Sequence, residues 1–428
     1  MARELDAEVV VIGAGLVGAA CALRLADAGR EVLLVDAQAP GMGASFGNAG
    51  HIATEQLFPL ASPEVIRASW RYLCDADSPL RLRMAYLLPI LPWLARFVWA
   101  ARPAGFARGV QALMALQQTS RVDLQDLLAH AGLAHLLHLQ GHLRVWETVG
   151  GEQEGLAEAS TLQPYGVRTE AVSAAVVHAQ APRLAPEVAG GVLYPDTGHV
   201  DDPHAVCAGL VDALLRAGGR VQQARVRKID QAGDFTLTLA TGQGRAIRCR
   251  QLLLCAGAWS KPLAANLGYR VPLDTERGYH ITLPWPDPAI APGEPGEPGR
   301  IALPIASIER KVIMTPMSMG LRMTGTVEFG GLQLPPDPRR FALLRTQMLA
   351  LMPGTRTDSA STWMGFRPSL PDHLPVICEA PPHRGVFFAF GHQHLGLTLC
   401  GVTARLVTDL VLGRVPGIDM APYHVGRF

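Results

Sequence analysis

Near the start of the chain, two short runs of apolar residues flank a segment with helical spacing. The runs at 9–12 and 32–35 contain only Val, Ile and Leu, which is typical of parallel strands buried on both faces. Between them, apolar residues recur at three- and four-residue spacing as far as Ala28, and Gly29 follows as a typical helix end. The pattern predicts a strand, a turn, a helix and a second strand over residues 8–36.

A similar but weaker unit is predicted over residues 201–257. Asp202 before Pro203 forms a favourable N-cap and first helical residue, and the helical pattern that follows ends at a pair of glycines. Two strand patterns come next. The second of them, at 251–255, ends in the small-residue turn AGAWS.

Elsewhere the pattern changes along the chain. Residues 62–180 are mostly helical in pattern, whereas 271–330 read as short antiparallel strands with a Pro/Gly-rich loop at 287–299. A helix is predicted over 341–352, and a strand, a glycine turn and a helix over 386–412. We find no internal repeat, so the chain is predicted to weave between two domains.

The first unit carries the motif G-x-G-x-x-G where its strand ends and its helix begins. In this position the first glycine permits a tight turn, the second lets the backbone approach a pyrophosphate, and the third allows close packing of helix on strand. The helix N-terminus then faces the phosphates. Asp36, with Ala37 after it, ends the second strand and is expected to bind a ribose hydroxyl, so a dinucleotide site is predicted. The motif comprises Gly13, Ala14, Gly15, Leu16, Val17 and Gly18.

The dinucleotide is expected to be FAD rather than NAD. An NAD-binding domain usually continues directly with further strand–helix units, whereas here the second unit begins near residue 201. The glycine-rich stretch SFGNAGH, residues 45–51, intervenes and is not suited to a packed helix or strand. An interrupted nucleotide-binding domain suits FAD, which is longer and is usually enclosed between domains.

The predicted fold class is therefore α/β (α+β overall), with a Rossmann-like FAD-binding domain interleaved with a substrate domain. The FAD-binding domain is assigned residues 1–61, 196–265 and 361–428. The substrate domain, built on a mostly antiparallel sheet plus helices, is assigned residues 62–195 and 266–360.

Five segments along the chain resemble the FAD-dependent D-amino-acid oxidase superfamily. Within it, the chain is most similar to the bacterial D-amino-acid dehydrogenases and to relatives that oxidise cyclic imino acids such as D-hydroxyproline. The first and last motifs are specific, whereas the middle is matched mainly by order and spacing. The segments are VVVIGAGLVGAACALRLADAGREVLLVDA, SFGNAGHI, LLLCAGAWS, GFRPSLPDHLPVI and GHQHLGLTL.

The resemblance implies where FAD lies. Ser45 and Asn48 would hydrogen-bond to the cofactor, and Val226 would contact the adenine through its backbone. A helix N-terminus at the GHQHLGLT turn would stabilise the charge of the reduced flavin by about 0.3–1 kcal/mol. The other implied contacts are Ala49, Gly50, His51, Ala256, Gly257, Arg367, Gly391, His392, Gln393, His394, Leu395, Gly396, Leu397 and Thr398.

Oxidation of an amino acid requires that the enzyme hold the substrate carboxylate, and a guanidinium does so bidentately. Arg367 belongs to the flavin-side motif, and Arg277 enters a strand that the family places over the flavin face. Tyr279 and His280 alternate on that strand, so only one can face the pocket. We expect Tyr279 to add its hydroxyl to the carboxylate and His280 to lie behind it. The histidines expected to line the amine side are His51, His392 and His394.

FAD is expected to bind noncovalently. Sarcosine-oxidase-like members of the superfamily attach their flavin through a cysteine near the segment that corresponds to GFRPSLPD. No cysteine occurs here between residues 361 and 373.

Composition and charge narrow the class of partner and compartment. The formal net charge is +1, and no Lys/Arg-rich block is present, so no nucleic-acid partner is expected. The seven cysteines form no CxxC pair and no metal-type spacing with histidine. Together with an N-terminus that lacks the pattern of a signal peptide, they predict reduced thiols and a cytoplasmic location.

One apolar stretch, at 84–95, leaves two alternatives open. It is too short to span a bilayer and contains two prolines, so a buried helix pair is one interpretation. The other is an interfacial patch in which Trp93, Phe97 and Trp99 contact lipid, which implies a peripheral site on the inner face of the plasma membrane.

The leading functional hypothesis is an FAD-dependent D-amino-acid dehydrogenase for small or cyclic substrates such as D-alanine, D-proline or D-hydroxyproline. Its electrons would pass to a quinone or another respiratory acceptor. The alternatives are an oxygen-using oxidase of glycine or sarcosine, an NAD-linked reductase, and a subunit of a hetero-oligomeric amino or imino acid dehydrogenase.

Overall fold

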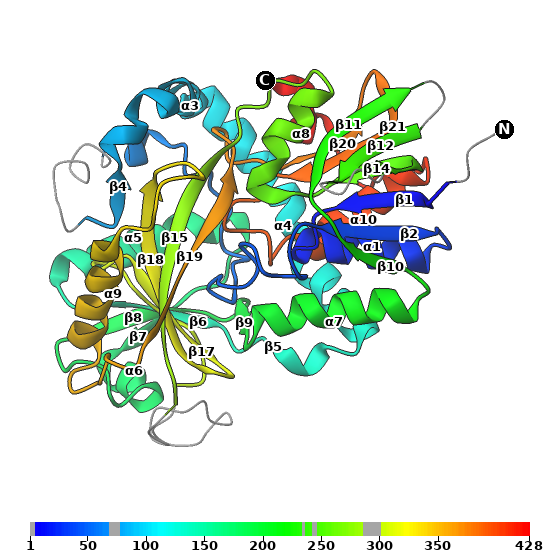
Figure 1. Ribbon diagram of the computed structural model, residues 1–428. Helices are drawn as coiled ribbons and strands as arrows, with labels where there is room; N and C mark the ends of the chain where they lie inside the picture. The colour runs from blue at the N-terminus through cyan, green and yellow to red at the C-terminus, as the bar shows by residue number, and fades with distance from the viewer. Residues whose placement is uncertain (1–4, 68–77, 233–235, 242–245, 286–300) are drawn as a thin grey trace.

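The computed structural model describes residues 5–67, 78–232, 236–241, 246–285 and 301–428. The loop predicted at 287–299 lies outside these residues. Two domains lie side by side, with the first β-strands of the chain on the right of Figure 1 and the large antiparallel sheet on the left.

The first domain is built on a six-stranded sheet whose strands are parallel except for the last. Its central strand β1 (Ala7–Ile12) is apolar on both faces: Val9 and Val11 enter one core, and Val10 and Ile12 enter the other. In spatial order the strands are β10 (Arg220–Gln223), β2 (Val32–Asp36), β1, β14 (Cys249–Leu254), β21 (His383–Phe390) and β20 (Val376–Ala380).

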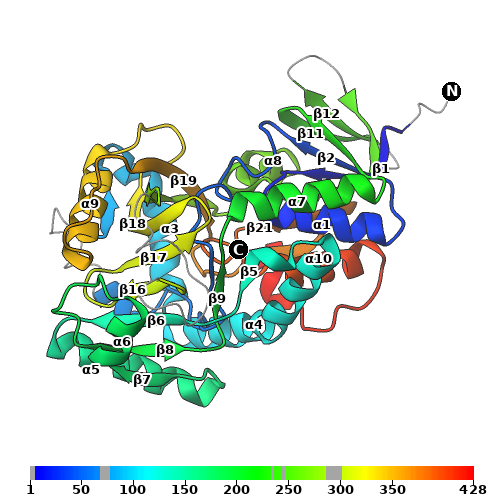
Figure 2. The ribbon, with the colours of Figure 1, turned by 90° about the horizontal axis from the view of Figure 1, so that it is seen from below.

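Helices cover one face of this sheet, and a small sheet with a short helix covers the other (Figure 2). The first face packs against α1 (Leu16–Asp27), α4 (Pro103–Ala131), α7 (Pro203–Arg216) and α10 (Cys400–Val411). The second packs against β11 (Val226–Ala232), β12 (Thr236–Thr241), β13 (Ala246–Ile247) and α8 (Ser260–Asn266).

The second domain is built on a nine-stranded, mostly antiparallel sheet. Helix α9 (Pro338–Leu351) covers one face, where Leu344 and Met348 pack with Ile281 and Met323. The strands are β19 (Ser361–Ser369), β15 (Asp274–Leu283), β18 (Gly320–Phe329), β17 (Val312–Met317), β16 (Ile305–Ser307), β6 (His142–Trp146), β8 (Gly190–Tyr194) and β7 (Glu170–Ser173), with β4 (Leu80–Leu82) beside β18.

A small sheet and three further helices surround the junction of the domains and the rim of the large sheet. A three-stranded sheet contains β3 (His51–Ile52), β9 (Gly198–Val200) and β5 (Leu137–His138). The remaining helices are α3 (Leu87–Ala100), α5 (Val149–Leu162) and α6 (Ala174–Gln180).

The structure confirms the interleaved α/β architecture but moves two elements between domains. Strand β19, assigned from the sequence to the FAD-binding part, pairs with β15 as the edge of the large sheet. Helix α4, assigned to the substrate part, packs on α10 and α7 of the first domain. Both assignments depend on long-range packing, which the local pattern does not report.

Candidate active site

The crevice for a dinucleotide lies where the strand order of the six-stranded sheet reverses, between β1 and β14. Here the turn after β1 packs on the turn after β14. A methyl group on Gly13, whose φ is +108°, would lie 2.3 Å from the carbonyl oxygen of Cys255. One on Gly18 would lie 1.8 Å from the carbonyl oxygen of Gly13. Packing therefore requires the first and third glycines of the motif, in the roles that the sequence predicts for them.

The middle glycine leaves the start of α1 open. Gly15 is the N-cap, and no side chain caps it; the N–H of Leu16 donates to Ser45 Oγ over 3.0 Å. A methyl group on Gly15 would meet only this hydroxyl, at 3.1 Å. The N–H groups of Val17 and Gly18 precede the first intrahelical bond, which runs from Ala19 to the carbonyl oxygen of Gly15 (2.8 Å), and they are suited to a pyrophosphate.

Asp36 ends β2 beside this turn. Its carboxylate accepts hydrogen bonds from the N–H groups of Ala14 (2.7 Å) and Gln38 (2.9 Å). A carboxylate has about four lone-pair positions, so these bonds are compatible with a further one from a ribose hydroxyl. Val226 begins β11 close by, because the N–H of Ala224 donates to the carbonyl oxygen of Asp36 (2.7 Å).

The SFGNAGH stretch is a loop stabilised by its own hydrogen bonds. Asn48 donates from Nδ2 to the carbonyl oxygen of Ser45 (3.1 Å) and accepts at Oδ1 from the N–H of Gly50 (2.7 Å). Both ends of the Asn48 amide therefore hold the loop, and its hydrogen bond to the cofactor stays a prediction. Gly50 has φ +67°, and a methyl group there would lie 2.6 Å from the carbonyl oxygen of Val200.

Side chains of the large sheet hold the same loop from the other side. Arg322 donates to the carbonyl oxygen of Asn48 (2.9 Å), and His280 Nδ1 lies 2.9 Å from the carbonyl oxygen of Gly47. His280 stacks on Trp363, and its burial, with Arg322 nearby, lowers its pKa to about 3, so the ring is neutral. His280 therefore faces the SFGNAGH loop, whereas from the sequence we expect it to lie behind Tyr279.

The C-terminal loop, residues 391–399, forms consecutive turns rather than the start of a helix. Helix α10 begins at Cys400, five residues later than the predicted start at Leu395. Gln393 has φ +53° and donates its N–H to the carbonyl oxygen of Pro368 (3.1 Å). This bond holds the loop against the GFRPSLPD segment. The family resemblance implies the same arrangement, in which the two segments border one site.

These loops have the properties that FAD requires. Gln393 Nε2 is buried and has no hydrogen-bond partner, so an acceptor on a cofactor would satisfy it. Gly257 has φ +53° and nothing within 4 Å of the position of a Cβ, and Gly396 meets only the Cβ of His392 at 3.7 Å. Small residues thus line the expected position of FAD along these loops. Fold and site define a dinucleotide-binding oxidoreductase whose crevice a second domain closes.

Arg367 lies on the face of β19 that is turned to this crevice. Its guanidinium lies over Gly278 of the paired strand, where a methyl group would come within 2.6 Å of Nη2. Desolvation lowers the pKa of Arg367, and Glu276 opposes that effect. None of the residues that the structure describes accepts a hydrogen bond from this half-buried guanidinium. A bidentate anion such as a carboxylate would supply the missing acceptors.

Arg277 and Tyr279 lie on the opposite face of the same strand pair, against α9. The Arg277 guanidinium is fully buried and donates to Glu328 Oε1 (3.0 Å) and to backbone carbonyl oxygens, including those of Gly331 (2.7 Å) and Leu334 (2.7 Å). The Tyr279 hydroxyl donates to Glu328 Oε2 (3.1 Å). The prediction that these two side chains bind the substrate carboxylate is therefore wrong: they stabilise a buried carboxylate of the protein.

The three predicted histidines occupy different environments. His392 is buried, pairs with Thr403 Oγ1 (3.0 Å), and has a pKa lowered to about 3 by burial. His51 uses both ring nitrogens on protein partners, Gly198 and Glu55. His394 is exposed and interacts electrostatically with Arg367, so it is the histidine placed beside the predicted carboxylate site. Its role on the amine side stays a prediction.

Several residues of the site escaped the sequence analysis. Strands of the large sheet carry three side chains whose contact with the SFGNAGH loop was not predicted: Arg322, Trp363 and His280. A usable signal existed in Gly278 and Gly365, because a glycine inside a strand often marks close approach of another group. These two are paired across β15 and β19, on the face that carries Arg367.

One thiol reaches the dinucleotide turn: buried Cys207 donates from Sγ to the carbonyl oxygen of Ala14 (3.3 Å). Cys378, the cysteine nearest in sequence to the GFRPSLPD segment, lies on β20, is only 4% exposed and packs in the second core of the six-stranded sheet. Noncovalent attachment of FAD stays a prediction.

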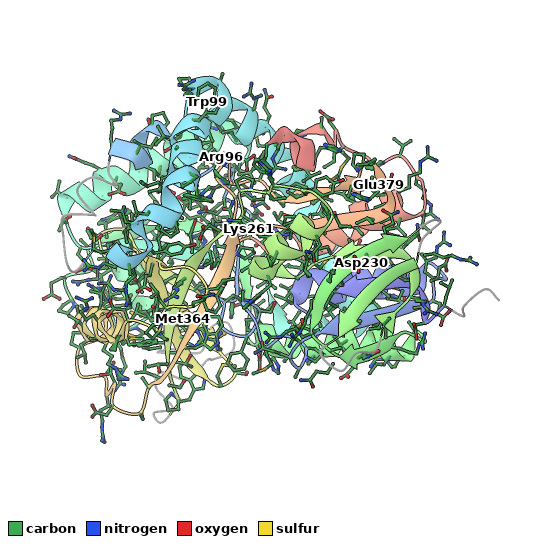
Figure 3. The ribbon with its side chains drawn as sticks, turned by 45° about the horizontal axis from the view of Figure 1, so that its top comes forward. Arg96, Trp99, Asp230, Lys261, Met364 and Glu379 are labelled. Carbon is green, nitrogen blue, oxygen red and sulfur yellow. The ribbon has the colours of Figure 1, made fainter. Side chains whose placement is uncertain are left out.

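The 84–99 segment is partly buried and partly exposed, and its contact with lipid stays a prediction. Trp93 of α3 is buried and donates from Nε1 to the carbonyl oxygen of Ser369 (3.2 Å), whereas Leu88 and Trp99 are 77% and 64% exposed. Trp99 stands at the outer rim of the molecule (Figure 3). Among the described residues no single helix is long and apolar enough to cross a bilayer; α3 and α4, bent by 86°, meet the criterion only as a pair.

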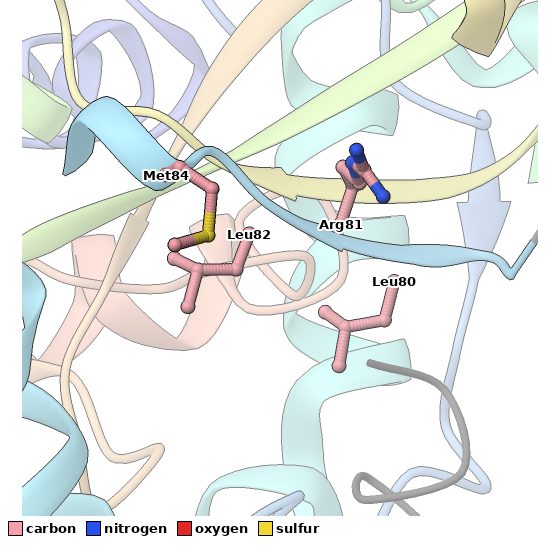
Figure 4. A pocket seen from close by; sticks show the side chains of 4 residues that line it. All are labelled: Leu80, Arg81, Leu82 and Met84. Atoms are coloured by element: carbon pink, nitrogen blue, oxygen red, sulfur yellow. The ribbon is translucent and has the colours of Figure 1, made fainter. Parts of the chain in front are cut away.

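A cavity of about 250 Å³ opens beside the start of this segment (Figure 4). Its lining is apolar apart from one guanidinium, and it contains none of the residues that the sequence assigned to the active site. The lining residues are Leu80, Arg81, Leu82 and Met84.

Comparison with known proteins identifies the family. The DAO family, described as FAD dependent oxidoreductase, matches residues 8–410, and the chain belongs to this family. This result confirms the resemblance inferred from the motifs and the FAD cofactor. A D-amino-acid oxidase of Bradyrhizobium diazoefficiens is 32% identical over 98% of both chains. A D-amino acid dehydrogenase of Paramagnetospirillum magneticum is 32% identical over 98% of this chain and 99% of its own.

Solved structures show the same fold at lower sequence identity. Glycine oxidase from Geobacillus kaustophilus superposes with a TM-score of 0.72 over 99% of both chains, at 21% identity. L-proline dehydrogenase from P. horikoshii gives a TM-score of 0.71 at 16% identity and covers 100% of this chain and 98% of its own. At these identities the likeness establishes the fold alone.

Proposed function

We propose that this FAD-dependent oxidoreductase oxidises the Cα–N bond of small or cyclic D-amino acids, such as D-alanine, D-proline or D-hydroxyproline. The guanidinium of Arg367, which has no hydrogen-bond acceptor among the described residues, carries this proposal, because it offers a bidentate site for an α-carboxylate beside the loops expected to bind FAD. The relatives named as D-amino-acid oxidase and dehydrogenase, which match over nearly the whole chain, support the substrate class.

The residues of the site position and desolvate the substrate. Oxidation removes a hydride from Cα and a proton from the amine, and leaves an imine that water hydrolyses when the amine is primary. FAD, when bound, accepts the hydride. Arg367 would fix the carboxylate, the glycine pair Gly278 and Gly365 would let the substrate approach the sheet, and His394 would border the amine.

Anaerobic mixing of the FAD-loaded protein with D- and L-amino acids tests the proposal. D-alanine, D-proline or D-hydroxyproline should bleach the flavin absorbance, and their L-enantiomers should not. Bleaching by L-enantiomers alone, or by none of these substrates, would overturn it.

The electron acceptor separates two variants of the proposal. We propose a quinone or another respiratory carrier, and the second candidate is an oxygen-using oxidase of glycine or sarcosine. The name of the 32% identical D-amino-acid oxidase of Bradyrhizobium diazoefficiens supports oxygen as the acceptor, but not these two substrates. A ubiquinone analogue should reoxidise the reduced protein at least tenfold faster than air-saturated buffer. Stoichiometric hydrogen peroxide with faster reoxidation in air would establish the oxidase. Activity of the isolated chain also decides against a subunit that needs a partner.

We further propose that α3 contacts the inner face of the plasma membrane. Leu88 and Trp99 of α3 and Met84 just before it are exposed and form an apolar surface, and Arg102 lies over the Trp99 ring at 3.4 Å. In flotation with phosphatidylglycerol-containing vesicles, a Leu88→Ser/Trp99→Ser variant should lose binding. Val149→Ser, which removes an apolar side chain 71% exposed on another helix, should not. Equal flotation of all three proteins would contradict this contact.

A further inference from the structure

Three side chains converge behind the end of the SFGNAGH loop. His51 begins β3, Glu55 follows it by four residues, and His142 begins β6. One nitrogen from each ring and one carboxylate oxygen all lie within 4.8 Å of one another. Glu55 is 6% exposed and His142 is 2% exposed, so the group lies inside the protein.

The hydrogen bonds of the two rings fix their tautomers. His51 Nδ1 lies 3.1 Å from the carbonyl oxygen of Gly198, which only accepts, so Nδ1 carries the hydrogen. Thr197 donates its hydroxyl hydrogen to the carbonyl oxygen of Tyr194 (2.9 Å), so its oxygen accepts from His142 Nδ1 (2.9 Å). In the neutral rings, both Nε2 atoms therefore carry lone pairs.

These lone pairs meet a carboxylate that is itself incompletely satisfied. His51 Nε2 lies 3.0 Å from Glu55 Oε1, and Glu55 Oε2 is buried without any partner. His142 Nε2 has no hydrogen-bond partner among the described residues. Three groups that can only accept thus face one point. A single proton can bridge His51 and Glu55, but it leaves Oε2 and His142 Nε2 unsatisfied.

We infer that His51, Glu55 and His142 bind one divalent first-row transition metal ion, with Zn²⁺ as the reference case. Two imidazoles and one carboxylate are a recognised donor set for such ions. Metal-binding histidines usually donate their other ring N–H to a backbone carbonyl or another fixed acceptor, as both rings do here. The stacking of His142 on Tyr194, with centroids 4.8 Å apart, further holds its ring in place. Water would complete the coordination.

The site adds a function that the proposed oxidation does not require. It lies at the end of the SFGNAGH loop, and His394 interacts electrostatically with Glu55 and His51. A bound ion would fix β3 and β6 to one another and so hold the end of the loop that follows Gly50. The test below measures binding of the metal alone, so its outcome is independent of substrate and acceptor.

The test uses untagged, FAD-loaded protein stripped with a chelator and then titrated with Zn²⁺ by calorimetry, with metal content measured after gel filtration. We expect one Zn²⁺ per chain and, by X-ray absorption, a shell of nitrogen and oxygen with two imidazoles. Glu55→Gln and His142→Gln should each weaken binding at least 100-fold. His178→Gln, a half-buried histidine on α6 that bonds to the carbonyl oxygen of Val188, should bind as the wild type does.

Two results would overturn the inference. One is the absence of stoichiometric Zn²⁺ in wild-type protein that retains its FAD, which would show that a proton alone occupies the pair. The other is equal binding by the wild type, Glu55→Gln and His142→Gln. If either variant fails to fold, the X-ray absorption spectrum of the wild type decides, because a sulfur ligand or a shell without imidazole places the ion elsewhere.

Discussion

The two faces of the β15–β19 strand pair use the same residue type in opposite ways. On the face against α9, Arg277 is fully buried, and its donors bond to Glu328 and to backbone carbonyl oxygens. On the face toward the first domain, Arg367 lies over Gly278 and has no acceptor among the described residues. Arg277 therefore stabilises the fold, whereas the donors of Arg367 remain available to a ligand.

The difference shows what separates a structural arginine from one that binds a ligand. It is whether the protein supplies acceptors for the guanidinium donors, rather than the residue type or the motif. A buried group whose donors are satisfied by the protein has no capacity left for a substrate. A guanidinium over a glycine, with small residues beside it, leaves both donors and space. Four substitutions on this strand pair test the contrast.

Arg277→Met should have the largest effect, and on stability. It removes the buried charge partner of Glu328, for which only Arg83 at 3.7 Å and the Tyr279 hydroxyl remain, and breaking a buried ion pair typically costs about 3–5 kcal/mol. Denaturant unfolding with a tryptophan signal measures this loss. Arg339→Met is the control, because Arg339 is 67% exposed in its pair with Asp337, and water screens such a pair, so the substitution should change stability far less. A raised half-saturation constant with unchanged unfolding would reverse the assignment.

Arg367→Ala should instead act on substrate binding. Loss of two charge-assisted hydrogen bonds is expected to raise the half-saturation constant for the D-amino acid by about 10²–10³-fold. FAD content, measured by absorbance, should stay at the wild-type value. Arg367→Lys keeps the charge but not the fork and should fall between the two. If half-saturation is unchanged with a full complement of flavin, Arg367 does not hold the carboxylate.

His280→Gln should change the pH dependence of stability. The folded-state pKa of His280 is lowered to about 3 from 6.5, so the unfolded chain binds more protons between these values. The stability that neutral His280 contributes is present above pH 6.5 and is lost as the pH falls toward 3, by up to about 1.4 kcal/mol per pH unit. Glutamine does not titrate, so unfolding midpoints of the variant should fall less steeply below pH 6.5. Parallel pH profiles would show that His280 titrates normally.

Gly278→Ala should have the smallest effect. The added methyl group would lie 2.6 Å from Arg367 Nη2, so the guanidinium must shift. We expect about a tenfold rise in half-saturation, because a misplaced anchor costs on the order of 1–2 kcal/mol. Gly43→Ala, where nothing lies within 4 Å of the new methyl group, is the matched control. Equal half-saturation constants would mean that the space over Gly278 is not part of the substrate site.

The sequence predicts local features of this molecule well and long-range ones poorly. The first strand–helix–strand unit and the close packing of Gly18 on Gly13 follow from contacts within a few tens of residues, so the local pattern contains them. The partner of β19 and the packing of α4 depend on segments more than 70 residues away. No local pattern distinguishes one antiparallel edge strand from another.

The same limit applies to the candidate site. Arg277 and Arg367 both enter strands beside flavin-side motifs, and alternation alone does not say which face of a strand meets the cofactor. A register shift between Tyr279 and His280 further disturbs that alternation. The glycines at 278 and 365 indicate the correct face, because the residues that alternate with them are those that α9 covers.

The order of strands in the six-stranded sheet has a consequence for how the protein is made. Strand β14 pairs on one side with β1, but its other neighbour, β21, is encoded at residues 383–390 of 428. During translation, the edge of β14, which carries three buried leucines, therefore stays open until β21 has left the ribosome. The loop at 391–399 emerges later still, so the nascent chain must persist without the stabilisation that cofactor binding gives the finished enzyme.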